Sequence, residues 1–180
     1  KKIVRILEAH SALAGLIIEN LKLTYKQKIL EFDGMWSSSL TDSVIRGKLD
    51  NQAVDYSTRI SGLNEILNVT TKPVIFDVDN GGRIEHLPYL VKTLERAGVS
   101  AIVIEDKIGL KKNSLFKDQI GIKQDTLENF CKKLKKAKQS KISDDLFIVA
   151  KIESFILGKN LKDALKRAEA YSRAGADAIL

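Results

Sequence analysis

Short runs of apolar residues alternate along the chain with longer segments in which apolar residues recur every three or four positions. Six runs are predicted to be strands, at residues 4–7, 32–36, 73–76, 101–104, 147–152 and 178–180. The helical period predicts five intervening helices, at residues 12–21, 56–67, 84–97, 125–138 and 161–174. Apolar strands that alternate with helices are typical of a parallel sheet covered by helices. The pattern therefore predicts an α/β fold.

Several helix ends carry local signals. Two predicted helices start with a capping residue that is followed three positions later by an acidic one, Asp125 with Glu128 and Asn160 with Asp163. Gly98 and Gly175 stand where a glycine would end the preceding helix.

Composition limits the class of protein. The chain has 180 residues and 44% hydrophobic residues, enough for one domain with a core and too few for two ordinary domains. No apolar run approaches the roughly 20 residues of a membrane-spanning helix. The start of the chain lacks a Met and a secretory cleavage site, so we expect a chain trimmed at its front. The single cysteine permits no internal disulfide, which favours a cytoplasmic location.

The net charge of +7 is local. Residues 107–141 contain eleven lysines and three acidic residues, a net +8, and the rest of the chain carries −1. Within the predicted helix at residues 125–138, an apolar stripe that includes Cys131 leaves the lysines facing solvent. No aromatic residues are interleaved with them, as a single-strand binding surface would require. We therefore favour a solvated helix face over nucleic-acid binding, and a buried, inert Cys131 over a nucleophile.

Acidic residues follow three neighbouring strands. Asp77 and Asp79 come after the third predicted strand, Glu105 and Asp106 after the fourth, and Glu153 after the fifth. The ends of parallel barrel strands meet on one face, where these carboxylates would repel one another unless a cation compensates. Mg²⁺ is the natural ion for an all-oxygen shell. The alternative is that they are loop carboxylates that cap helices; their recurrence favours the metal.

Two connections have the composition of ligand-binding loops. The small residues of 37–39 follow the second strand, where they form either a plain polar turn or a site whose backbone N–H groups approach an anion. Residues 106–124 form a long connection, which we predict to be an active-site lid with Gly109 and Gly121 as hinges. It contains donors suited to a phosphoryl group, namely Lys111, Lys112, Asn113 and Ser114. His10 is expected to be a hydrogen-bonded structural residue.

At these residues the sequence resembles the phosphoenolpyruvate mutase branch of the isocitrate lyase superfamily. The matching segments run in order along nearly the whole chain, at residues 8–11, 35–40, 77–82, 104–107, 111–115, 164–171 and 174–177. The branch is indicated by Lys-Lys-Asn-Ser at 111–114, because the carbon–carbon lyases of the superfamily typically have Lys-Lys-Cys-Gly-His there. Asn113 thus occupies the place of their catalytic cysteine.

The resemblance implies a (β/α)₈ barrel that interconverts phosphoenolpyruvate and phosphonopyruvate with Mg²⁺. It implies that Asp77 binds Mg²⁺ directly, with Asp79 and Glu105 assisting through water. The pyruvate moiety would lie against the backbone N–H groups of Ser38, Ser39 and Leu40, with Trp36 beside it. The phosphoryl group would lie between Asp50 and the lid residues Lys111, Asn113 and Ser114. Family members usually have an arginine where this chain has Lys151, and this residue would also contact the substrate.

The resemblance also predicts what this chain lacks. A (β/α)₈ barrel typically has about 250 residues, so we expect one barrel domain, residues 1–180, truncated after its sixth strand. The missing part would include a segment with an active-site histidine and helices exchanged between subunits of a homo-oligomer. Three alternatives remain: a phosphonopyruvate hydrolase, a carbon–carbon lyase of the superfamily, and a non-catalytic module with a basic binding surface. The first two, like the mutase, act on a small-molecule substrate.

Overall fold

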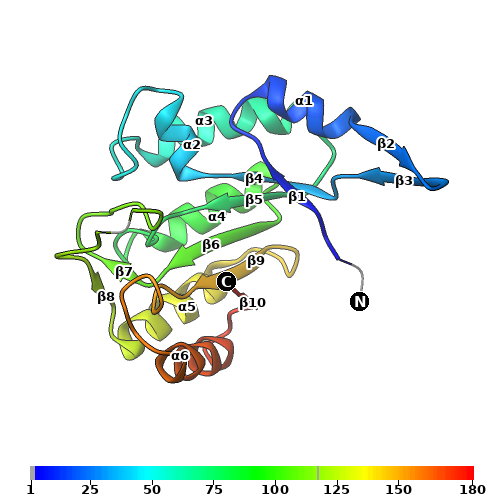
Figure 1. Cartoon of the computed structure of the whole chain (residues 1–180). Coiled ribbons are helices and arrows are strands. Elements are labelled where there is room, and N and C mark those ends of the chain that lie inside the picture. The colour runs from blue at the N-terminus through cyan, green and yellow to red at the C-terminus, as the bar shows by residue number, and fades with distance from the viewer. Residues whose placement is uncertain (1–2, 117) are drawn as a thin grey trace.

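A six-stranded parallel sheet forms the centre of the computed structural model, which describes residues 3–116 and 118–180. In spatial order its strands are β1 (Ile6–Glu8), β4 (Gly34–Ser37), β5 (Val74–Asp77), β6 (Ala101–Glu105), β9 (Phe147–Lys151) and β10 (Ala178–Ile179). Each adjacent pair is parallel, so the carboxyl ends of all the strands lie along one edge (Figure 1). The six predicted strands are confirmed, with small shifts of their ends.

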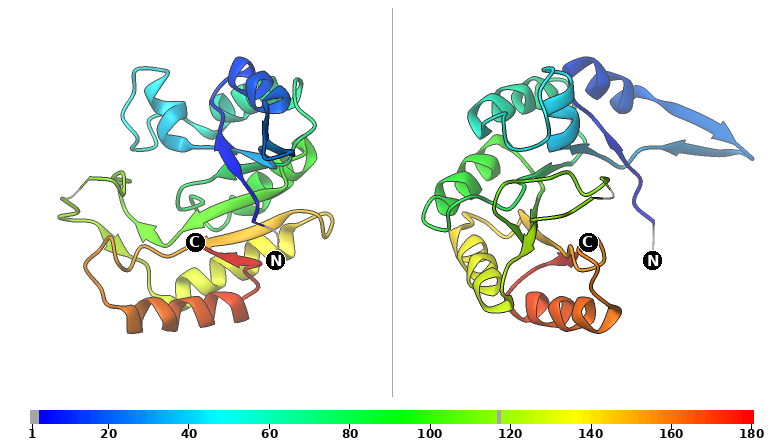
Figure 2. Two further views of the ribbon diagram at one scale, coloured as in Figure 1. Left: turned by 45° about the vertical axis from the view of Figure 1, so that its right-hand side comes forward. Right: turned by 60° about the vertical axis from the view of Figure 1, so that its left-hand side comes forward.

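Helices cover the outer face of the sheet. They are α1 (Ala12–Asn20), α3 (Tyr56–Leu67), α4 (Leu87–Ala97), α5 (Leu127–Ser140) and α6 (Leu161–Arg173). In the right-hand view of Figure 2 they follow one another in an arc around the strands, as in a (β/α) barrel that is open between β1 and β10. This arrangement confirms the predicted α/β barrel class.

The core lies between the strands and this arc of helices. Phe76, Ile102 and Ile148 of the central strands are fully buried against apolar residues of the helices. The rings of Phe130 on α5 and Tyr171 on α6 pack with their centroids 4.6 Å apart. Burial of these large side chains fixes the helices against the sheet and so fixes the strand ends relative to one another.

Some elements were not predicted from the sequence. A hairpin of β2 (Lys22–Tyr25) and β3 (Lys28–Glu31) projects from the body of the molecule (Figure 1). The short helix α2 (Ser39–Val44) follows β4. A two-stranded ribbon of β7 (Lys107–Ile108) and β8 (Lys123–Gln124) forms the base of the predicted lid.

Most of the predicted capping residues and helix-ending glycines are confirmed. Asn160 caps α6, because its side chain accepts a hydrogen bond from the Asp163 N–H, and Gly98 and Gly175 both have positive φ. The predicted cap Asp125 is wrong. Thr126 caps α5 instead, and its hydroxyl accepts from the Asn129 N–H at 3.1 Å.

The basic helix differs from the prediction at one lysine. Lys133 is buried on the inner side of α5, where its Nζ donates to the Asn80 carbonyl at 2.7 Å. Its charge therefore helps to hold the loop after β5 rather than facing solvent. Among the described residues, no helix is long and apolar enough to cross a membrane.

Candidate active site

A cavity of about 240 Å³ opens at the carboxyl ends of β4, β5, β6 and β9. Its lining combines strand ends, the start of α2, the loop after α2 and the segment between β7 and β8. The lining residues are Trp36, Ser38, Ser39, Leu40, Asp50, Asp77, Glu105, Lys111, Asn113, Ser114, Leu115 and Lys151. Every predicted site residue except Asp79 is among them. The structure thus brings together residues that are more than 100 positions apart in the sequence.

Asp79 does not line this cavity, but its backbone is hydrogen-bonded to two of the acidic residues that do. It is buried and has φ of 52°, a left-handed conformation that aspartate tolerates better than most residues. In this conformation its N–H donates to Asp77 Oδ1 at 2.8 Å, and its carbonyl accepts from the Glu105 N–H at 2.8 Å. The backbone of Asp79 therefore sets the positions of both neighbouring carboxylate residues.

The small residues after β4 form the start of α2 rather than an irregular turn. Ser38 caps this helix, and its Oγ accepts from the Leu40 N–H at 3.2 Å. The buried Ser39 donates its hydroxyl proton to Asp77 Oδ2 at 2.9 Å. The predicted contact between a ligand and the Leu40 N–H would thus have to replace this rather long bond to Ser38.

Part of the β7–β8 segment closes over the cavity. Lys111 donates to Asp50 Oδ1 at 2.8 Å and to Ser39 Oγ at 2.5 Å, and it also donates to Asp79. Asn113 Nδ2 donates to Asp50 Oδ2 at 2.6 Å. Because Asp50 lies outside this segment, its two oxygens connect the predicted lid to the loop after α2.

Ser114 meets a second group of charges that involves Glu153. Its hydroxyl donates to Glu153 at 2.9 Å and accepts from Lys107 Nζ at 2.7 Å. Lys151 Nζ lies 2.7 Å from Glu153 Oε1 and 3.0 Å from Glu105 Oε2. Glu153 is fully buried, so these two lysines compensate its charge.

The electrostatics of the site are balanced between buried acids and lysines. Burial raises the pKa of Glu105, and burial together with the Asp77 charge raises the pKa of Asp79. Burial also acts to raise the pKa of Asp77, but Lys111 and Arg59 outweigh it, so that pKa is lowered. Burial opposes the charge of Lys111, but Asp79 and Asp77 prevail and raise its pKa. The lysine is therefore held as a cation among the carboxylates.

The carboxylates do not form a ready-made metal cage. Within residues 3–116 and 118–180, no three Asp, Glu, His or Cys side chains gather as a group that could hold a metal ion. Asp77 and Glu105 do line the same cavity and offer hard oxygen ligands. Mg²⁺ is usually bound by one or two carboxylates, with water and substrate oxygens completing its shell. The donor set therefore fits Mg²⁺ bound together with a ligand.

Lys112 and Asp106, which the sequence places near the predicted site, both lie outside it. Lys112 points away and forms an ion pair with Asp118 at 3.1 Å. Asp106 is fully buried on the helix side, where its Oδ2 accepts from Tyr171 at 2.7 Å and from Arg167 at 3.2 Å. His10 Nδ1 lies 3.1 Å from Glu8 Oε2, which confirms that this histidine is hydrogen-bonded.

Two residues that support the site, Lys107 and Arg59, were not predicted from the sequence. Glu153 was predicted at a strand end, but its contacts with Ser114 and Lys151 were not. Lys107 and Arg59 are both buried, and the sequence analysis assigned neither of them a role in the site. Lys107 follows the buried strand β6 by two residues, and this position could have indicated that its side chain is near the site. For Arg59 the helix pattern offered no comparable signal.

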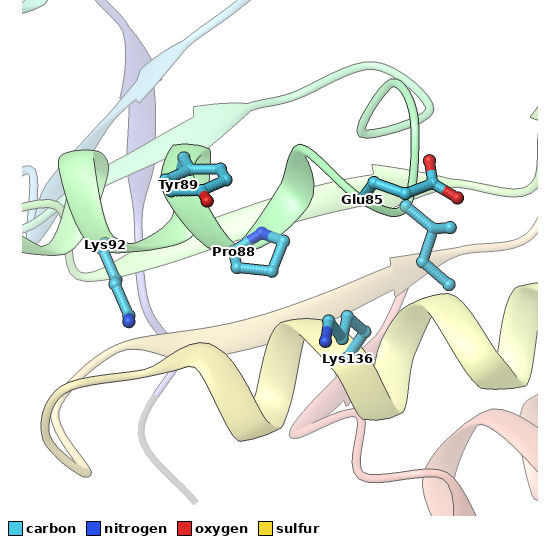
Figure 3. Close-up of a pocket in the computed structure, with 6 residues that line it drawn as sticks. Glu85, Pro88, Tyr89, Lys92 and Lys136 are labelled. Atoms are coloured by element: carbon cyan, nitrogen blue, oxygen red, sulfur yellow. The ribbon is translucent and has the colours of Figure 1, made fainter.

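A second, larger cavity lies on the outer side, between α4 and α5. It has a volume of about 610 Å³ and is lined by Ile84, Glu85, Pro88, Tyr89, Lys92 and Lys136. In Figure 3, Pro88, Tyr89 and Lys92 extend from α4, and Lys136 comes from α5. It shares no lining residue with the strand-end cavity, and its Tyr89 is 74% exposed. The strand-end cavity therefore remains the candidate active site.

Comparison with known proteins identifies the family. The family model described as phosphoenolpyruvate phosphomutase matches residues 1–180. The chain belongs to this family. A phosphoenolpyruvate phosphomutase from Tetrahymena pyriformis is 36% identical over 178 residues, which are 97% of this chain and 55% of that protein.

Solved structures of the superfamily share the fold. The crystal structure of a phosphoenolpyruvate phosphomutase from Streptomyces platensis subsp. rosaceus matches with a TM-score of 0.90 and 32% identity, over 99% of this chain and 59% of that one. A phosphonopyruvate hydrolase in complex with oxalate and Mg²⁺ matches with a TM-score of 0.85 and 28% identity, over 99% and 57% of the two chains. The relatives of this chain also include a 2,3-dimethylmalate lyase from Eubacterium barkeri. The chain thus spans a little over half the length of these relatives.

Proposed function

We propose that this chain is the larger part of a phosphoenolpyruvate mutase, an isomerase that interconverts phosphoenolpyruvate and phosphonopyruvate. In this reaction the bond between phosphorus and the enol oxygen breaks and a bond from phosphorus to C3 forms. The enol oxygen becomes a ketone, and no proton is gained or lost overall. The observation that carries the proposal is the pairing of Lys111 and Asn113 with Asp50 above the carboxylate-lined cavity.

The chemistry requires positioning and charge stabilisation more than covalent help from the protein. Lys111 is placed to stabilise negative charge on the moving phosphoryl group, and Asn113 offers amide protons beside it. Asp50 orients both donors through its two oxygens. The start of α2, with Ser38, Ser39 and Leu40, would hold the pyruvate moiety that stays in place while phosphorus moves, and Trp36 would pack beside it.

The proposed cofactor is Mg²⁺, held by Asp77 with the help of Asp79 and Glu105. When bound, it would neutralise the oxygens of the pyruvyl unit and so stabilise the enolate. The same chemistry suggests that oxalate, which resembles a planar pyruvate enolate, binds this site as it binds the related hydrolase. Lys151 lies at the edge of the cavity, where it would contact an anionic end of the substrate.

Asn113 favours a mutase or hydrolase over a carbon–carbon lyase. The superfamily lyases are expected to have a cysteine here, and an amide side chain cannot act as a thiol acid or base. The choice between mutase and hydrolase depends on water. A closed lid that excludes water favours transfer to C3, and an open site would release free phosphate and pyruvate.

Phosphorus NMR of the full-length protein with Mg²⁺ and phosphonopyruvate tests the proposal. A mutase produces phosphoenolpyruvate, and a hydrolase produces inorganic phosphate. Lys111→Met should lower turnover about 10²–10³-fold, as expected for a lost electrostatic contact with a reacting group. Its neighbour Lys112 provides the matched control, because Lys112→Met removes a lid lysine that points away from the cavity. Equal loss in both variants, or no phosphoenolpyruvate from the wild type, would refute the assignment.

We also propose that the full-length protein is a cytoplasmic homo-oligomer that acts on this small substrate and does not bind nucleic acid. The single cysteine, Cys131, supports a reducing compartment. It is half-buried rather than fully buried as predicted, and this burial raises its pKa and makes it less reactive. Size-exclusion chromatography with light scattering would give the oligomeric state.

A further inference from the structure

Arg59 is a buried arginine with no place in the proposed chemistry. It lies in the first turns of α3 and is 1% exposed, although it does not line the strand-end cavity. A guanidinium removed from water to this degree is costly unless anionic groups compensate it. Its partners should therefore show what it does.

Those partners come from two sides of the candidate site. Nε donates to Asp42 Oδ2 at 3.0 Å, and Nη1 lies 3.6 Å from Asp79 Oδ2. Asp42 belongs to α2, the helix that starts at Ser39, and Asp79 belongs to the turn after β5. The guanidinium also lies 4.4 Å from the centroid of the Phe76 ring. Arg59 thus joins the α2 side of the site to the carboxylate side.

A second contact from α3 reaches the same turn. Tyr56 lies one helical turn before Arg59, and its hydroxyl donates to the Val78 carbonyl at 2.7 Å. Two successive residues of the turn, Val78 and Asp79, are therefore held by neighbouring side chains of one helix. This matters because Asp79 has positive φ, a conformation that must be stabilised by its surroundings.

The guanidinium also has unused donors. Among the described residues, Nη1 and Nη2 have no hydrogen-bond partner although both are buried. The 3.6 Å separation from Asp79 is an ion pair that is too long for a hydrogen bond. The other oxygen of Asp79, Oδ1, accepts from Lys111 of the predicted lid. Asp79 is thus shared between a fixed cation on α3 and a cation on a segment expected to move.

We propose that Arg59 is a positioning residue that holds the Asp79 carboxylate toward the metal-binding edge when Lys111 is withdrawn with the lid. When the lid opens, Asp79 loses its contact with Lys111. The guanidinium of Arg59 is then the cation that still holds the Asp79 carboxylate. This inference rests on the proposed metal site. It goes beyond that site because it assigns the orientation of Asp79 to a residue outside the cavity.

Binding of Mn²⁺ alone, followed by electron paramagnetic resonance on the full-length protein, tests this without relying on turnover. Arg59→Met should weaken Mn²⁺ binding about 10-fold, the lower end of what outer-shell partners of metal ligands contribute. Arg59→Lys should restore part of this loss. Arg46→Met is the matched control, because Arg46 also contacts Asp42, at 3.4 Å, but is not a partner of Asp79. It should leave Mn²⁺ binding unchanged.

Two further variants separate positioning from folding. Arg59→Met leaves Asp42 buried without its main cation, so the double variant Arg59→Met/Asp42→Asn removes both charges together. In an Asp79→Asn background, Arg59→Met should cause no additional loss of Mn²⁺ affinity, because the residue it positions is already altered. A persistent loss in that background, or wild-type affinity in the folded double variant, would overturn the proposal. If the wild type itself binds no Mn²⁺, the metal site and this inference both fail, and the NMR experiment still decides the reaction.

Discussion

Lys111 and Lys112 show how far the role of a residue depends on the backbone that carries it. Both are lysines of the same lid segment, so residue type alone offers both as phosphoryl donors, and the family resemblance singles out Lys111. In the structure Lys111 is 8% exposed and reaches three partners in the cavity, but Lys112 pairs with Asp118 outside it. These two adjacent side chains thus differ in direction, and only Lys111 lines the cavity.

Lys151 stands where the resemblance to the family leads us to expect an arginine. Its single ammonium contacts Glu105 and Glu153, and its side chain is 27% exposed at the cavity edge. An arginine can keep such contacts and still present two parallel donors to an anionic substrate. We therefore predict that Lys151→Arg lowers the KM for phosphonopyruvate by about 3- to 10-fold with a smaller change in kcat.

Steady-state kinetics of the full-length protein would measure this change. Lys166→Arg, on the exposed side of α6, is the control for adding a guanidinium without touching the cavity. An unchanged or higher KM in Lys151→Arg would show that the lysine is fully adapted to its substrate.

At the scale of the elements, the regular parts could be predicted and the exceptions have physical reasons. The six parallel strands and five helices followed from apolar periodicity because burial decides them. The β2–β3 hairpin was missed because its turn residues, Lys26 and Gln27, have φ of 47° and 62° without a glycine. The meeting of the strand-end carboxylates was predictable, because the carboxyl ends of parallel strands lie along one edge of the sheet. Arg59 was not, because a single charged residue in a helix has no sequence pattern that marks it as buried.

Helix α1 is fastened to the loop before β5 by one carboxylate. Glu19 accepts hydrogen bonds from Thr70 Oγ1 at 2.5 Å and from Thr71 Oγ1 at 2.7 Å. The Thr70 and Thr71 hydroxyl groups lower the pKa of Glu19 from 4.5 to about 2. A carboxylate whose pKa is lower in the folded state contributes stability above its unfolded pKa. That contribution is lost as the pH falls from about 4.5 toward 2.

We therefore predict that Glu19→Gln lowers the free energy of unfolding by about 1 kcal/mol at neutral pH, since solvent screens a partly exposed group. The difference from the wild type should shrink below pH 4.5. Urea unfolding at several pH values would measure it. Glu65→Gln, an exposed carboxylate on α3, is the control. A difference that stays constant down to pH 3 would mean that the Glu19 charge does not stabilise α1.

At the scale of the whole molecule, the sheet gathers charges of both signs at one edge. The carboxylates Asp77 and Glu105 would repel an anionic ligand, and Lys111 and Lys151 would attract it. In this structure the two lysines are already paired with carboxylates, so an anion gains little from them alone. A divalent cation would change the balance, because it would neutralise the carboxylates and leave the lysines free to bind the ligand.

We therefore predict that Mg²⁺ and oxalate stabilise the full-length protein together and not separately. A ligand at 100 times its Kd adds about 2.7 kcal/mol of stability, and each kcal/mol shifts the Tm by about 1–2 °C for a chain nearly twice as long as this one. The combination should therefore raise the Tm by about 3–5 °C in a thermal unfolding experiment, and EDTA should abolish the shift. Asp77→Asn should remove the joint effect, and Glu128→Gln, an exposed acid on α5, should leave it intact. An equal oxalate shift in EDTA would show that the anion binds the lysines directly, and that the carboxylates at the strand ends do not act through a metal.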